Sequence, residues 1–179
     1  PLMELSGKTM GIIGFGQIGK GVAKTAACFG MNVLACAAHP RTESGIDGVC
    51  MSNLDEILYK ADVLSLHCPL NAENKGLINR ETISKMRDGA IIINTARGGL
   101  VVEQDIADAL KSGKLKGFAA DVLAQEPPVN GSPLFNAPNC IITPHIAWAP
   151  IESRMRLINI ATENIRAFID GNPKNKVNH

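Results

Sequence analysis

The stretch Met10-Gly11-Ile12-Ile13-Gly14-Phe15-Gly16-Gln17-Ile18-Gly19 decides the fold that we expect for this chain. Its first four residues form an apolar run of strand length, and the glycines that follow have the spacing G-x-G-x-x-G. In the segment that follows, up to Gly30, apolar residues recur at helical spacing, at Ile18, Val22 and Ala26. The stretch is therefore predicted to be a strand, a tight glycine turn and the first turn of a helix.

This glycine turn predicts a dinucleotide site. Gly14 permits the tight turn, Gly16 lets a pyrophosphate approach the backbone, and Gly19 allows the helix to pack closely on the strand. The exposed N–H groups and the dipole of the following helix favour phosphates. A turn with only a structural role is the alternative.

The acid that usually follows about 20 residues later, and that binds the adenosine ribose, is missing. The second expected strand instead ends in Cys36-Ala37-Ala38-His39-Pro40-Arg41. Without that carboxylate a ribose 2′-phosphate is not repelled, and Arg41 or His39 could bind it. We therefore expect NAD or NADP as cofactor, with a slight preference for NADP; a solvated loop arginine is the alternative for Arg41.

Beyond the glycine turn, short apolar runs alternate with segments of helical spacing. This alternation predicts right-handed βαβ units and an α/β fold with a doubly wound parallel sheet of the Rossmann type. The expected strands are residues 10–13, 32–36, 63–66, 90–93, 117–120 and 140–143. The expected helices include residues 17–29, 81–86 and 103–111. A short helix that ends at residue 58 is expected to be opened by a capping box at residues 52–55. Pro150 is expected to open a long helix whose apolar face includes Ile158, Ala161, Ile165 and Phe168. Residues 126–138 are expected to form a loop.

Three loops that follow expected strands carry Arg97, Glu126 and His145. The carboxyl ends of parallel strands lie along one edge of a sheet, so a guanidinium, a carboxylate and an imidazole are expected to converge there with the glycine turn. These features suggest chemistry on an anionic substrate beside a nicotinamide. Taken singly, the alternatives are a solvated arginine, a surface acid and a buried structural histidine.

Composition excludes several other classes of protein. With 179 residues, a net charge of +1 and no run of like charges, the chain shows no nucleic-acid footprint. It contains no apolar run as long as a membrane span, and no signal peptide is visible. The five cysteines, which have neither C-x-x-C nor metal-ligand spacing, are expected to be mostly buried and reduced, as in a cytoplasmic protein. We expect no metal site.

The chain resembles the D-isomer-specific 2-hydroxyacid dehydrogenases over nearly its whole length. The matching stretches are Gly11–Gly19, His67-Cys68-Pro69-Leu70 with Gly76-Leu77-Ile78, Ile93–Leu100, Asp121–Pro127 and Pro144-His145-Ile146-Ala147. His145-Ile146-Ala147-Trp148, with Gly171-Asn172-Pro173 further on, is most similar to the glycerate dehydrogenase/hydroxypyruvate reductase branch.

The resemblance implies an NAD(P)-dependent oxidoreductase for small 2-oxo and D-2-hydroxy acids, such as hydroxypyruvate/glycerate or glyoxylate/glycolate. It implies that His145 is the general acid, that Glu126 hydrogen-bonds the other ring nitrogen, and that Arg97 binds the substrate carboxylate. Asp121 is implied to hold the nicotinamide carboxamide. The other residues implied to contact the cofactor are Gln17 and Ile18 at the pyrophosphate and Pro69, Asn74, Thr95, Ala96, Arg97, His145 and Ala147 along the groove. Asn74 stands where many relatives have Thr.

The resemblance also implies a longer protein with two domains. Family members carry a substrate domain before the cofactor domain, so we expect residues 1–179 to be the NAD(P)-binding domain of such a protein. The isolated chain is then expected to bind the cofactor without turning over substrate, and the full-length protein to be a homodimer. Two alternatives to an enzyme are a cofactor-sensing binding protein, like the transcriptional corepressors that resemble this family, and a dinucleotide-binding module whose Arg-Glu-His triad is vestigial.

Overall fold

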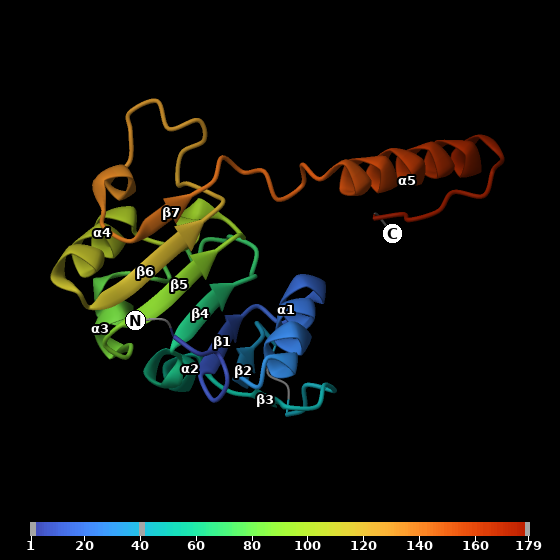
Figure 1. The fold of residues 1–179 in the computed structure, drawn as a ribbon. Helices are drawn as coiled ribbons and strands as arrows, with labels where there is room; N and C mark the ends of the chain where they lie inside the picture. Colours follow the sequence, from blue (N-terminus) through green and yellow to red (C-terminus); the bar gives the residue numbers. More distant parts are fainter. Residues whose placement is uncertain (1–2, 40–41, 178–179) are drawn as a thin grey trace. The chain divides into compact units, whose positions relative to one another are not determined.

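The computed structural model describes residues 3–39 and 42–177, and the chain divides into two compact units, Pro1–Pro144 and His145–His179. The first unit is built on a seven-stranded parallel sheet with the order β3-β2-β1-β4-β5-β6-β7 (Figure 1). Its strands are β1 (Thr9–Ile13), β2 (Asn32–Cys36), β3 (Val49–Met51), β4 (Val63–Leu66), β5 (Ala90–Asn94), β6 (Leu115–Ala120) and β7 (Cys140–Ile142). The doubly wound parallel sheet predicted from the alternating pattern is confirmed.

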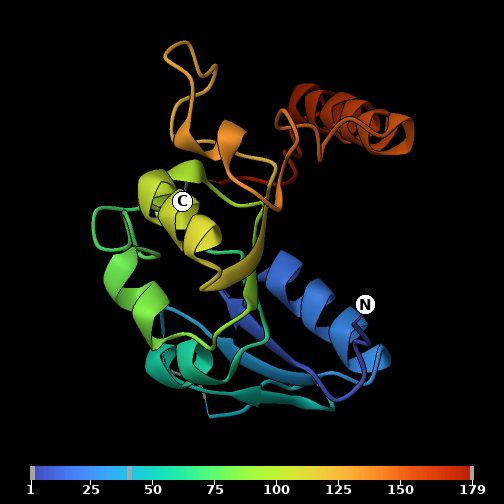
Figure 2. The ribbon, with the colours of Figure 1, turned by 60° about the vertical axis from the view of Figure 1, so that its left-hand side comes forward.

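Helices cover both faces of this sheet, as Figure 2 shows. One face packs against α2 (Leu54–Lys60), α3 (Arg80–Lys85) and α4 (Glu103–Ser112) in a core that includes Leu64, Ile92 and Phe118. The other face packs against α1 (Gln17–Cys28), mainly where β1, β2 and β3 lie. The direction of winding reverses between β1 and β4, and in such sheets ligands bind outside the carboxyl ends of the strands at this switch point.

Several elements differ from the prediction. The strand β3 has only three residues, too few for a hydrophobic period, and its Cys50 is exposed. Two 3₁₀ turns, η1 (Gly98–Leu100) and η2 (Pro133–Asn136), lie where loop was expected. The cap of α2 is Asn53 rather than Ser52, because the Asn53 side chain accepts a hydrogen bond from the N–H of Glu56 at 2.8 Å.

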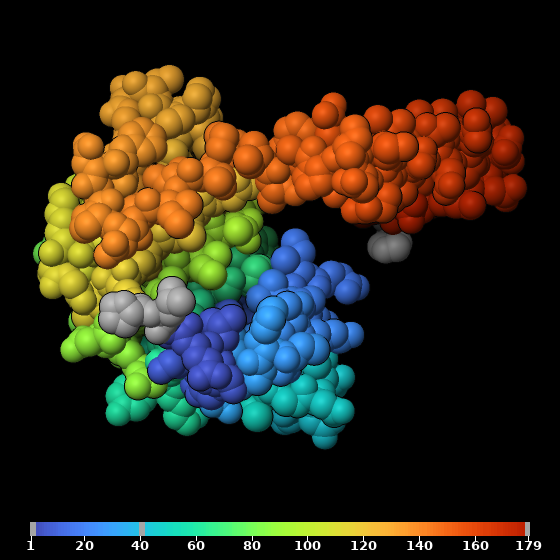
Figure 3. All heavy atoms as spheres, viewed as in Figure 1, coloured from blue at the N-terminus to red at the C-terminus, as the bar shows by residue number. Residues whose placement is uncertain are grey.

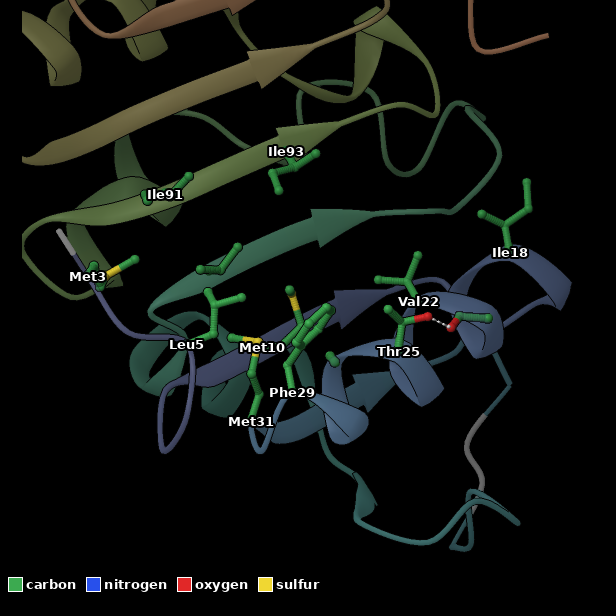
Figure 4. Close-up of a pocket in the computed structure, with 13 residues that line it drawn as sticks. Met3, Leu5, Met10, Ile18, Val22, Thr25, Phe29, Met31, Ile91 and Ile93 are labelled. Atoms are coloured by element: carbon green, nitrogen blue, oxygen red, sulfur yellow. Dashed lines mark hydrogen bonds between the residues drawn. The ribbon is translucent and has the colours of Figure 1, made fainter. Parts of the chain in front are cut away.

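On the face covered by α1, β4 and β5 are left partly open. An apolar groove of about 600 Å³ runs there between α1 and the strands. Figure 4 shows Val22 of α1 and Phe29, the C-cap of α1, opposite Ile91 and Ile93 of β5. In the space-filling view of the same side, green strand residues lie in a hollow beside the blue helix (Figure 3). The groove lies on the face of the sheet, and Ile18 is the predicted site residue that lines it.

The second unit contains α5 (Ile151–Ile169), and Pro150 is its N-cap, as the sequence predicts. The residues of its expected apolar face are exposed: Ile158, Ile165 and Phe168 are 64%, 62% and 73% accessible. No helix among the described residues is long and apolar enough to cross a membrane. The cysteines are free thiols, but the expectation that most are buried is wrong: Cys28 and Cys50 are exposed, and the other three are half-buried.

Candidate functional site: the carboxyl edge of the sheet

The glycine turn after β1 leaves no room for side chains at two positions. Gly14 has φ +100°, and its N–H donates to the carbonyl of Cys36 at 3.0 Å. A Cβ on Gly14 would lie 2.5 Å from the backbone nitrogen of Cys68, and one on Gly19 would lie 2.1 Å from the carbonyl oxygen of Gly14. Both glycines are therefore needed to bring β1, α1 and the loop after β4 together.

Gly16 serves a different purpose, because a Cβ there would meet no atom within 4 Å. It is the N-cap of α1 and is followed by the exposed residues Gln17 and Ile18. The first N–H groups of a twelve-residue helix thus face open space at the switch point. This arrangement fits a pyrophosphate, because Gly16 leaves room for close approach and the N-terminus of a helix favours an anion.

The loop after β4 forms the neighbouring wall. Nε2 of the half-buried His67 lies 2.8 Å from Ser65 Oγ, and burial lowers the pKa of His67, which keeps the ring neutral at pH 7. The Asn74 side-chain amide donates to the carbonyl of Pro69 at 2.7 Å and accepts from the N–H of Asn71 at 2.8 Å. In this structure Asn74 thus holds the loop closed around Pro69.

Two half-buried thiols flank the glycine turn at the ends of β2 and β4. Burial raises the pKa of both Cys36 and Cys68, so both are neutral thiols at pH 7. Beyond Cys36, Ala37 is half-buried and His39 is exposed, while Arg41 lies outside the described residues.

Asn94 shapes the loop that carries Arg97. It is fully buried at the end of β5; its side chain donates to the carbonyl of Arg97 at 2.9 Å and accepts from the N–H of Ala96 at 3.1 Å. Thr95 and Arg97 are exposed beyond this clamp, and Arg97 Nη1 donates to the carbonyl of Ala96 at 2.6 Å. A guanidinium is therefore presented from a fixed backbone at the carboxyl edge.

The loop after β6 is braced by two glutamates. Glu126 Oε1 accepts from the N–H of Leu123 at 2.8 Å, so the expected catalytic partner is held inside its own loop. Glu103, at the start of α4, accepts from the N–H of Ala124 at 2.8 Å and from the hydroxyl of Ser132 at 2.6 Å. Glu103 thereby fastens both sides of the loop that contains Glu126.

The loops of Arg97 and Glu126 also touch through their backbones. A Cβ on Gly98 would lie 1.9 Å from the carbonyl carbon of Leu123 and 2.3 Å from the nitrogen of Ala124. Only a glycine allows this approach. The loops after β5 and β6 therefore meet at one edge of the sheet. The predicted convergence of the Arg97, Glu126 and His145 side chains stays a prediction.

The segment after β7 joins the two units. Thr143 follows β7, and its hydroxyl donates to Oδ1 of Asp121 at 2.5 Å; Asp121 itself follows β6 and is 6% exposed. His145 and Ala147 belong to the second unit. His145 has φ +53°, a left-handed conformation that costs a non-glycine residue about 1–3 kcal/mol. Its carbonyl accepts from Trp148 Nε1 at 2.8 Å.

Sequence reasoning did not single out Asn94, Glu103 or Thr143. A polar residue that ends an apolar strand, as Asn94 does, is a signal that could have been used, because buried polar groups require partners. The partners of Glu103 are 21 and 29 residues away, and no local pattern reveals them. Within residues 3–39 and 42–177, no group of three His, Cys, Asp or Glu side chains could hold a metal ion.

A parallel sheet with this strand order, a glycine turn at its switch point and an open helix N-terminus define a dinucleotide-binding domain. Residues 1–147 match the family described as "D-isomer specific 2-hydroxyacid dehydrogenase, NAD binding domain". The chain therefore belongs to this family, and the predicted resemblance is confirmed.

Relatives of known name agree with this assignment. The chain is 51% identical over 178 residues to a hydroxypyruvate reductase from Blautia hydrogenotrophica and 45% identical over 179 residues to a glycerate dehydrogenase from Methylorubrum extorquens. Each alignment covers 99% of this chain and 55% of the relative. A crystal structure of D-lactate dehydrogenase with NAD⁺ from Lactobacillus jensenii is 29% identical, with a TM-score of 0.91, over 100% of this chain and 58% of that one. The chain thus spans little more than half the length of these relatives.

Proposed function

We propose that the full-length protein carrying this chain is an NAD(P)-dependent D-2-hydroxyacid dehydrogenase that reduces hydroxypyruvate or glyoxylate. The observation that carries the proposal is the carboxyl edge, where the loops of Arg97 and Glu126 pack together beside an open helix N-terminus. The alternative of a cofactor-sensing binding protein gains nothing from the relatives above, which are named as a reductase and dehydrogenases.

In this proposal Arg97, His145 and Glu126 have different roles in the reaction. Arg97 binds the substrate carboxylate through its planar set of donors and polarises the adjacent carbonyl. His145 protonates the carbonyl oxygen during reduction and accepts that proton during oxidation. Glu126 accepts from the other ring nitrogen, which fixes the orientation of the imidazole and balances its charge. The nicotinamide, when bound, supplies or accepts the hydride.

The cofactor is held by the residues expected from the sequence. Gly14, Gly16, Gln17, Ile18 and Gly19 hold the pyrophosphate. Asp121 accepts from the nicotinamide carboxamide, and the groove is completed by Pro69, Asn74, Thr95, Ala96 and Ala147. We further propose that residues 1–179 form the cofactor domain of a longer, two-domain cytoplasmic homodimer, inactive in isolation, and that it acts on small molecules rather than nucleic acid.

Turnover by the full-length protein tests the proposed function. NADH and NADPH oxidation is followed at 340 nm with hydroxypyruvate, glyoxylate, pyruvate and 2-oxoisocaproate. We expect saturable oxidation with at least one of the two smallest polar acids. Tight NADH binding with no turnover of any 2-oxo acid would instead favour the cofactor-sensing protein.

The segment after β2 predicts the cofactor preference. If Arg41 binds a ribose 2′-phosphate, Arg41→Ala is expected to weaken NADPH binding by about 1.5–3 kcal/mol and to leave NADH binding unchanged. Ala37→Asp is expected to favour NADH, because the new carboxylate accepts from the ribose hydroxyl and repels a phosphate. Dissociation constants from fluorescence titration of both cofactors provide the measurement.

Arg80→Ala is the matched control, since Arg80 is an exposed arginine on α3 and its side chain is 80% accessible. Equal losses of NADH and NADPH binding in Arg41→Ala, or no loss of either, would show that Arg41 is a solvated loop residue.

A further inference from the structure

Thr143 is tied twice to the end of β6. Its backbone N–H donates to the carbonyl of Ala120 at 2.9 Å, and its hydroxyl donates to Oδ1 of Asp121 at 2.5 Å. Thr143 itself is exposed, whereas Asp121 is 6% exposed. The hydroxyl of an exposed residue thus meets the carboxylate of a buried one at the edge where the strands end.

The chemistry of the pair assigns the roles. An ionised carboxylate only accepts hydrogen bonds, and a threonine hydroxyl has one proton, so the proton of Thr143 points at Asp121. A hydrogen bond of this length to a charged group is of the strong, charge-assisted kind. It restrains the rotation of the carboxylate about the Cβ–Cγ bond, a torsion whose distribution in aspartates is broad.

We propose that Thr143 is a positioning residue for the cofactor: it holds the Asp121 carboxylate in the orientation that accepts the N–H of the nicotinamide carboxamide. The proposal rests on the proposed function, which gives Asp121 that contact. The inference extends the proposed function by adding Thr143, a residue that touches neither substrate nor cofactor.

The test compares Thr143→Val, which keeps the shape without the hydroxyl, with Thr143→Ser, which keeps the hydroxyl. In the full-length protein, Thr143→Val is expected to weaken NADH binding about tenfold or more, as for a lost hydrogen bond to a charged group, and Thr143→Ser to match wild type. The second probe is reduced 3-acetylpyridine adenine dinucleotide, whose acetyl group replaces the carboxamide and has no N–H. All three proteins are expected to bind this analogue equally.

Two outcomes for Thr143→Val overturn this inference alone. Thr143→Val binding NADH like wild type would show that the hydroxyl does not act on the cofactor. Equal weakening of NADH and the acetylpyridine analogue would show a structural role only. The binding test does not depend on turnover. The proposed function therefore fails independently of this inference if wild type binds NADH but reduces no 2-oxo acid. Wild type that binds neither dinucleotide overturns both.

Discussion

Replacing His145 by alanine in the full-length protein is expected to reduce kcat for hydroxypyruvate or glyoxylate reduction by about 100- to 10,000-fold, the usual contribution of a positioned proton donor. The dissociation constant for NADH is expected to change little, because the glycine turn and Asp121 remain intact. Steady-state kinetics together with an NADH titration measure both quantities. A variant with more than a tenth of the wild-type kcat would remove His145 from the role of general acid.

Glu126→Gln provides a graded comparison. The amide keeps the size of the side chain and can still accept the Leu123 N–H, but it cannot balance the charge of an imidazolium. Its loss of kcat is therefore expected to be smaller than that of His145→Ala. Glu152→Gln is the matched control, because Glu152 is an exposed acid in the first turn of α5. Equal activity in the two glutamine variants would contradict the role of Glu126.

Much of the fold follows from periodicity. The strand Val63–Leu66 is buried at every position, and so short a run indicates a strand by its length. The glycine turn is equally readable, since Gly14 and Gly19 meet backbone atoms that leave no space for a Cβ. A short sequence pattern is sufficient to predict the strand and the glycine turn, because each is determined by residues close together in sequence.

The support of the site is harder to predict because it is made of long-range polar contacts. Glu103 stands in an ordinary amphipathic helix, and nothing near it in sequence indicates that both its oxygens bind residues after β6. The Asp121–Thr143 contact joins residues 22 apart that become neighbours only because β6 and β7 pair. Sequence spacing predicted which loops meet, but not which side chains hold them in place.

The contact between the loops of Arg97 and Glu126 depends on one missing side chain. At Gly98 a Cβ would lie 1.9 Å from the carbonyl carbon of Leu123 and 2.1 Å from its oxygen. These are backbone atoms of a loop that Glu103 fastens at Ala124, so they cannot move aside as the end of a flexible side chain can. Overpacking of this kind costs about 3 kcal/mol, at the upper end of the usual range.

Gly98→Ala is therefore expected to separate the two loops and to lower the rate of 2-oxo acid reduction by the full-length protein by on the order of 100-fold or more. Misplacing a substrate-binding group by about 1 Å costs on the order of 100-fold in rate, and here Arg97 and Glu126 are displaced relative to each other. Calorimetry is expected to show a melting temperature lower by about 6–12 °C, assuming a cofactor domain of this size unfolds as one transition.

Gly99→Ala is the matched control at the adjacent position. A Cβ there would lie 2.8 Å from the end of the Leu70 side chain, which is exposed and can rotate away. This variant is expected to keep most of its activity and its melting temperature. Only the first substitution drives a side chain into the backbone of the neighbouring loop. If Gly98→Ala and Gly99→Ala behaved alike, close backbone packing at Gly98 would not be what holds the loops of Arg97 and Glu126 together.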